Sequence, residues 1–214
     1  MVGLEDPKIA IDYLDETSFL QIYDEEDFYL TDKLLQNEVI EEQTIQHPIL
    51  DKSLLKHETF IKCDLEKLDA TDTIFKACDL SNCYLNESSL YQVKFENCKL
   101  IGVNFDQAYF KNVSFENCLL DMASLNQLNL KTVEFKNCRL SDASFNENKL
   151  SKVTFDNCNL NEMTFWNTNL KGIDISSCQF ETLEMEENLI KGLKVSPDQA
   201  AFFAHYFLGV KVKY

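Results

Sequence analysis

The sequence is poor in the residues that form tight turns, with five glycines and three prolines among 214 residues. This scarcity argues against an ordinary β-sandwich or β-barrel, in which glycine and proline shape the turns between strands. No apolar run approaches the roughly 20 residues that a membrane span needs. Residues 1–11 also lack the basic start and apolar stretch of a secretory signal. We therefore expect a cytoplasmic protein that does not associate with membranes.

The sequence also lacks the short motifs that carry catalysis. Its glycines are too scattered to form a phosphate-binding loop, and it contains neither HExxH nor GxSxG. It has three histidines and no CxxC, so a zinc site is poorly supported. We expect no enzyme, with no catalytic, cofactor-binding or metal-binding residues.

Basic residues are few relative to acidic ones, 20 against 36, which gives a formal net charge of −16. Such acidity argues against a protein that binds nucleic acid. Residues 1–42 hold 13 acids and two lysines, so the charge is concentrated at the front of the chain. Because apolar residues surround the acidic run at 24–27, we expect residues 1–35 to be an acidic extension that packs partly on the body.

A strict five-residue period dominates the rest of the chain. From Phe60 to Val195 every fifth residue is apolar, and 23 of these 28 central residues are Leu or Phe. Two residues before many of these centres lies a small or slim residue, such as Cys78 or Val93. Neither the 3.6-residue period of a helix nor the two-residue period of a strand produces this spacing.

A second period of 20 residues is superimposed on the first. The segment VKFENCKL at 93–100 returns as VSFENCLL at 113–120, and related segments follow at 133–140 and 153–160. Four sides of five residues make one coil of 20, so equivalent residues of successive coils would stack about 4.8 Å apart. Seven coils between Leu55 and Val195 would form a rod roughly 34 Å long.

These repeats resemble those of the pentapeptide repeat family over residues 40–195. The resemblance implies an all-β fold, a right-handed quadrilateral β-helix, to which we add a short C-terminal helix and strand. We divide the chain into the acidic extension at 1–35, the pentapeptide-repeat β-helix at 36–195, and a capping or dimerisation segment at 196–214.

All eight cysteines fall two residues before a central residue, and six of them, from Cys78 to Cys178, recur every 20 residues. Stacked Cα atoms near 4.8 Å would allow disulfides. In the cytoplasm, however, thiols stay reduced. We expect the cysteines to pack in the wall of the rod as small hydrophobic residues.

The repeat frame assigns outward residues to four faces, of which one is acidic. This face, called here the acidic face, has central residues at 65, 85, 105, 125, 145, 165 and 185, and only Lys67 offsets its carboxylates. The next face, centred on residues 70 to 190 and called the lysine face, is net positive. The charges either solvate the rod or form an acidic stripe that meets a basic groove on a partner. The candidate partner-binding residues of the acidic face are Asp64, Glu66, Glu87, Asp106, Glu147, Glu184, Glu186 and Glu187.

A helix is predicted from Ser196 to Gly209. Ser196 and Gln199 form a capping box, Pro197 suits the first turn, and Gly209 ends the helix. The alternation at 210–214 predicts a strand. The helix either only caps the open end of the rod or also forms a homodimer contact, because its apolar residues exceed what one face requires. The candidate dimer residues are Phe202, Phe203, Tyr206, Phe207 and Leu208.

The segments LKG at 170–172 and GLKVSPDQA at 192–200 resemble the C-terminus of Qnr-type quinolone-resistance proteins, and the similar MfpA type, of Gram-positive bacteria. That resemblance implies a dimeric DNA mimic that occupies the DNA-binding saddle of DNA gyrase or topoisomerase IV. It also implies protection of these enzymes from fluoroquinolones, their inhibition, or both. The unbroken frame has no counterpart to the projecting loops of the plasmid-borne relatives.

Two other functions remain open on sequence alone. The first is a pentapeptide-repeat scaffold that binds an unrelated protein through its N-terminal extension or aromatic C-terminus. The second is a structural rod without a specific partner. Reversing Glu87, Asp106 and Glu147 to lysine separates the DNA mimic from both of these functions, since only the DNA mimic would lose gyrase binding.

Overall fold

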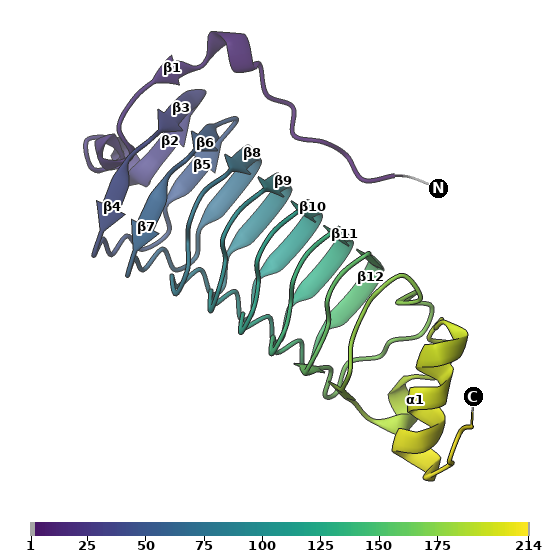
Figure 1. The fold of residues 1–214 in the computed structure, drawn as a ribbon. Coiled ribbons are helices and arrows are strands. Elements are labelled where there is room, and N and C mark those ends of the chain that lie inside the picture. The colour runs from purple at the N-terminus through teal and green to yellow at the C-terminus, as the bar shows by residue number, and fades with distance from the viewer. Residues whose placement is uncertain (1–2, 214) are drawn as a thin grey trace.

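The computed structural model describes residues 3–213 as a straight rod of stacked coils (Figure 1). Every strand pair inside the rod is parallel, and from Tyr29 onward each partner lies 20 residues further along the chain. The predicted all-β solenoid is thus confirmed, with about eight turns. No helix in residues 3–213 is long and apolar enough to cross a membrane.

The strands form one large sheet and two small ones. The first sheet has ten strands in the order β1-β3-β6-β8-β9-β10-β11-β12, with β2 and β5 attached to its side, while β4 pairs with β7 and β13 with β14. The long strands β8 to β12 each cover two sides of a coil. The strands are β1 (Asp15–Glu16), β2 (Tyr29–Thr31), β3 (Lys33–Gln36), β4 (Val39–Glu41), β5 (Ile49–Asp51), β6 (Leu54–Lys56), β7 (Thr59–Ile61), β8 (Asp69–Lys76), β9 (Ser89–Glu96), β10 (Tyr109–Glu116), β11 (Asn129–Lys136), β12 (Lys149–Asp156), β13 (Met163–Thr164) and β14 (Leu183–Glu184). The helices are the 3-10 turns η1 (Ile11–Tyr13), η2 (Phe19–Tyr23), η3 (Glu26–Phe28) and η4 (Glu187–Leu189), and the α-helix α1 (Pro197–Leu208).

The core consists of columns of apolar side chains, one residue per coil in each column. The central residues point inward, and the column from Phe75 to Phe155 stacks ring on ring at 4.7–5.1 Å with interplanar angles of 3–11°. Each fully buried Leu or Phe contributes about 1.5–3 kcal/mol of transfer free energy. The five-residue period therefore reflects a continuous apolar core.

The cysteines lie in the wall of the rod as predicted, buried and unbridged. The Cys98 thiol contacts the carbonyl oxygens of Phe75, at 3.3 Å, and Glu96, at 3.5 Å, and its counterparts in other coils do the same. The neighbouring Cys158 thiol and burial raise the pKa of Cys178 well above that of a free thiol. A thiol held in its protonated form is a poor nucleophile and metal ligand.

The edges between sides require backbone that most residues avoid. At nearly every edge one residue adopts positive φ, and asparagine fills this place repeatedly, as at Asn97, Asn117, Asn137 and Asn157. Asparagine tolerates the left-handed region better than other non-glycine residues. Along this edge Asn137 donates to Asn117 at 3.2 Å and accepts from Asn157 at 2.8 Å.

The paired coils begin well before residue 36, the boundary predicted from the sequence. β1 already pairs with β3, and Phe19 and Ile22 of η2 close the N-terminal end of the rod. Glu38 accepts hydrogen bonds from the Phe19 backbone at 2.8 Å and the Ser18 hydroxyl at 3.2 Å, which ties η2 to the first coils.

At the other end α1 covers the last coil. The predicted capping box is present, Gly209 adopts a left-handed conformation with φ 66°, and the Gln199 amide donates to the carbonyls of Ile175 and Cys178 at 2.9 Å each. The predicted C-terminal strand is wrong for residues 210–213, which have no strand geometry. The Val210 backbone instead donates to the Ala204 carbonyl of α1 at 3.2 Å. Tyr214 lies outside the described residues.

Candidate partner-binding face

The eight predicted acidic residues lie along one straight side of the rod, as the repeat frame requires. Parallel bridges connect Asp64 through equivalent residues of each coil to Thr164, which pairs in turn with Glu184. Six coil spacings separate the first residue from the last, or about 29 Å at 4.8 Å per coil. The structure divides the acidic residues along this length into three groups.

The first group, near the N-terminal end, is partly neutralised. The Lys67 ammonium lies 3.6 Å from a Glu66 carboxylate oxygen and 3.7 Å from one of Glu87. Asp64 accepts a hydrogen bond from the Glu66 backbone at 3.2 Å. Because these side chains are solvated, the ion pairs contribute little stability but reduce the local negative charge.

The middle of the face is polar more than it is charged. Asp106 accepts from the Ser124 hydroxyl at 2.7 Å and from the Asn126 backbone at 2.9 Å. Asn126 and Asn146 each accept the same backbone hydrogen bond one coil further on, so an uncharged amide can replace Asp106 in this role. Glu147 is exposed and accepts from a neighbouring glutamine. Asp106 therefore holds two coils together as well as contributing charge.

The third group lies beside α1 and is the most strongly acidic. Both Glu186 oxygens accept from the Asn167 backbone at 3.0 Å, while Glu184 and Glu187 are exposed. Sequence reasoning missed Asp142 and Glu162, which line a hollow of about 510 Å³ together with Glu184 and Tyr206. The 20-residue period could have found them, because residues 142, 162 and 182 occupy one column at the border of this face.

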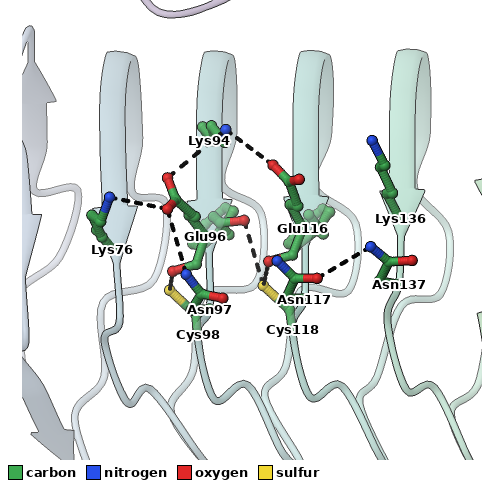
Figure 2. A network of polar contacts seen from close by, with 12 residues as sticks. Lys76, Lys94, Glu96, Asn97, Cys98, Glu116, Asn117, Cys118, Lys136 and Asn137 are labelled. Carbon is green, nitrogen blue, oxygen red and sulfur yellow. Dashed lines mark hydrogen bonds and ion pairs between the residues drawn. The ribbon is translucent and has the colours of Figure 1, made fainter.

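The other faces do not repeat this pattern. On the face that carries the Phe75–Phe155 column, Lys76 lies 3.0 Å from Glu96 and Lys94 lies 3.1 Å from Glu116, so the charges alternate (Figure 2). On the lysine face, Lys111 stacks on the Tyr91 ring at 4.8 Å. A second such pair joins Lys131 and Tyr109 at 5.2 Å.

The five candidate dimer residues have two different environments. Phe203 is 9% exposed, and Phe180 of the last coil contacts both Phe202 and Phe203, with ring centroids 5.3 and 6.1 Å apart. These phenylalanines, with the half-buried Phe207, pack α1 on the rod. Tyr206 and Leu208 are 44% and 69% exposed, so they alone among the five present substantial apolar surface. Within residues 3–213, no group of three or more His, Cys, Asp and Glu side chains is arranged to hold a metal ion.

Comparison with protein families identifies the repeats. A family model described as a pentapeptide repeat region matches residues 53–125, 88–165 and 128–195, which together cover two thirds of the chain. No curated protein sequence matches the chain significantly.

Several solved structures are similar in outline. QnrB1, a plasmid-mediated fluoroquinolone resistance protein, is 22% identical in a trypsin-treated variant form, with a TM-score of 0.41 and coverage of 87% of this chain and 99% of that one. A pentapeptide repeat protein from the Arabidopsis thaliana thylakoid lumen is 18% identical, covering 61% and 70%, with a TM-score of 0.33. HetL, involved in heterocyst differentiation regulation in Nostoc sp. strain PCC 7120, is 14% identical, covering 83% and 91%, with a TM-score of 0.29.

Proposed function

Because this chain belongs to the pentapeptide repeat family, we propose that it is a protein-binding rod that occupies the DNA site of DNA gyrase or topoisomerase IV. In this role it protects the enzyme from fluoroquinolones or inhibits it, and it catalyses no reaction of its own. The observation that carries the proposal is the straight row of carboxylates on the acidic face.

The average density of these carboxylates suits the mimicry of nucleic acid. Eight acids less the Lys67 charge give about one net negative charge per roughly 4 Å over about 29 Å, comparable to the phosphate spacing of about 3.4 Å along one DNA strand, with most of the charge in the groups at the two ends. Asp142 and Glu162 add charge at the C-terminal end of the row. A topoisomerase groove lined with Lys and Arg would bind this face in place of phosphates.

The choice of partner rests on the C-terminal sequence. Residues 170–172 and 192–200 resemble the ending of Qnr-type proteins, and the coils from Tyr29 to Met185 stack without a projecting loop. In a two-fold dimer, the exposed Tyr206 and Leu208 of one copy would pack on those of the other. Two rods joined at this end would extend the acidic row along a common axis.

The first test is a DNA gyrase supercoiling assay with purified protein, titrated with and without ciprofloxacin. Rescue of the drug-poisoned enzyme supports protection, and loss of supercoiling without rescue supports a gyrase-binding DNA mimic. If neither occurs with gyrase or topoisomerase IV, the topoisomerase proposal is wrong and a scaffold for an unrelated partner becomes the better explanation. Affinity should also fall at least tenfold between about 100 and 400 mM salt.

Charge reversal locates the contact on the rod. The double variant Glu147→Lys/Glu184→Lys changes two exposed acids of the acidic face. The matched control Asp156→Lys/Glu181→Lys makes the same charge change on other faces near the same end. We expect the first variant to bind gyrase at least tenfold more weakly, and the control to stay within threefold of the unmodified protein. Equal losses would mean that net charge, and not this face, governs binding.

A further inference from the structure

The N-terminal residues 3–10, called here the strap, lie along the edge between the lysine face and the face with the Phe75–Phe155 column. In Figure 1 this segment runs back from η1 alongside the long strands, and it contacts the middle of β8 and β9 at Asp72 and Gln92. The Lys8 backbone donates to Asp72 at 2.8 Å. The Gln92 amide donates to the Glu5 carboxylate at 3.1 Å and to the Asp6 carbonyl at 3.5 Å. The strap therefore crosses successive coils in register with their edge residues.

The strap buries edge residues that are exposed elsewhere. Asp72, Gln92 and Asn112 are 8%, 2% and 7% exposed. Residues at the matching positions of two other edges, Asn82 and Asn97, are exposed. Further along the strap edge, Thr132 is half-buried and Lys152 exposed. The burial of the first three residues thus coincides with the coils that the strap crosses.

Few interactions hold the strap in place. It pairs with no strand, whereas β1, only a few residues later, joins the main sheet through β3. Leu4, Pro7 and Ile9 are half-buried, and the remaining strap residues are exposed. A segment with so few buried contacts can leave its site without unfolding the rod.

The first residues of the strap border a hollow on the same edge. It has a volume of about 290 Å³ and is lined by Gly3 and Leu4 of the strap together with Thr132, Val133, Lys152 and Thr154, among others. The pKa of Lys94 is raised above its ordinary value. Partial burial alone would lower this pKa, but the hydrogen bond to Glu116 and the nearby Glu96 and Asp6 carboxylates outweigh the effect of burial. Four features therefore follow one another along the strap edge. They are the Asp72 carboxylate as a hydrogen-bond acceptor, the Gln92 amide as a donor, the Lys94 ammonium near Asp6, and the apolar hollow.

We propose that this edge is a binding groove for an extended acidic peptide and that the strap is its displaceable occupant. The strap defines the chemistry of a partner peptide: an apolar residue for the hollow, an acidic pair beside Gln92 and Lys94, and a free backbone N–H for Asp72. Such a peptide, presented by a partner protein, binds when the strap leaves. This surface is separate from the acidic face and does not depend on the proposed topoisomerase binding.

The test releases the strap from the full-length protein without changing the groove. Glu5→Ala removes an acceptor for Gln92, and Lys8→Pro removes the backbone donor to Asp72. A fluorescent peptide with the sequence of residues 3–10 is then titrated against the double variant and the unmodified protein, with anisotropy as the readout. We expect the peptide to bind the released variant at least tenfold more tightly, because the strap no longer competes for the groove.

Two additional substitutions in the released variant show whether the peptide uses the groove. Gln92→Ala should abolish peptide binding. Gln107→Ala, a glutamine with the same positive φ on an edge without the strap, should leave it unchanged. Equal affinity for the released and unmodified proteins, or no saturable binding to the released variant, would overturn the proposal. So would equal effects of Gln92→Ala and Gln107→Ala.

Discussion

Glu58 occupies a wall position that the next six coils fill with cysteine, and its substitution gives a direct test of how this wall is built. Its side chain is 0% exposed, and among residues 3–213 neither carboxylate oxygen has a hydrogen-bond partner. Burial and, to a smaller extent, the nearby Glu38 carboxylate raise the pKa of Glu58 to about 7. An uncompensated charge in this position would cost several kcal/mol, so the carboxyl group retains its proton below neutral pH.

The sign of the effect on stability follows from this raised pKa. Between about pH 4.5 and pH 7 the folded protein holds a proton on Glu58 that the unfolded chain has released, so the free energy of unfolding falls as pH rises. A shift of about 2.5 pH units at 1.36 kcal/mol each gives a loss of up to about 3 kcal/mol. Neutral Glu58→Gln and Glu58→Cys should both lack this loss, and Glu58→Cys should exceed the unmodified protein in stability near pH 8.

The assay is urea unfolding at about pH 5 and about pH 8, followed by circular dichroism. Glu41→Gln, at an exposed carboxylate of β4, is the matched control and should follow the unmodified protein at both pH values. Glu58→Cys is informative because it extends the existing cysteine column without adding an amide that needs partners. Parallel pH profiles for the Glu58 variants and the unmodified protein would refute this account of the buried carboxyl group.

Three further variants test the core, the cysteine column and the end of the rod. Phe115→Ala should lower the free energy of unfolding by about 3–5 kcal/mol, because it opens a cavity between two stacked rings; a loss below about 1 kcal/mol would contradict this packing. Cys118→Ser should cost no more than about 1 kcal/mol in urea unfolding, because the Thr168 hydroxyl makes the equivalent bond to a carbonyl 23 residues earlier, at 2.9 Å. Tyr206→Glu/Leu208→Glu should convert the proposed dimer to a monomer in light scattering with little change in melting temperature; a dimer that persists would place the contact elsewhere, and a monomeric unmodified protein would contradict the dimer.

The sequence predicted the body of the rod well because the relevant interactions are local and periodic. The inward direction of Phe75 or Leu125, the cysteine positions and the Ser196–Gln199 capping box all depend on spacing within a few residues. The start of the coils was less clear. Leu30 lies in the five-residue frame and is fully buried, but it follows an acidic run that reads as solvated chain.

The surface was harder to predict because hydrogen bonds between coils occupy polar atoms that would otherwise be available to a partner. The frame places Asp106 on the acidic face but does not show that it accepts a backbone hydrogen bond from the next coil. The strap is still less predictable, since Gln92 and Glu5 are 87 residues apart in sequence and no repeat connects them. Contacts of this kind depend on the completed fold and leave no periodic signal.

A register that repeats every 20 residues makes the stacked sides themselves tolerant of length changes only in whole coils. Removal of residues 113–132 would place Val133 directly after Asn112, so every later column would keep its partners in a rod about 4.8 Å shorter. Loss of a single residue would instead rotate all later positions by one place and turn charged side chains such as Glu116 toward the interior. Such rods should therefore lengthen and shorten in evolution by duplication or deletion of 60-nucleotide units, with the separation between the two ends of the acidic face changing in equal steps.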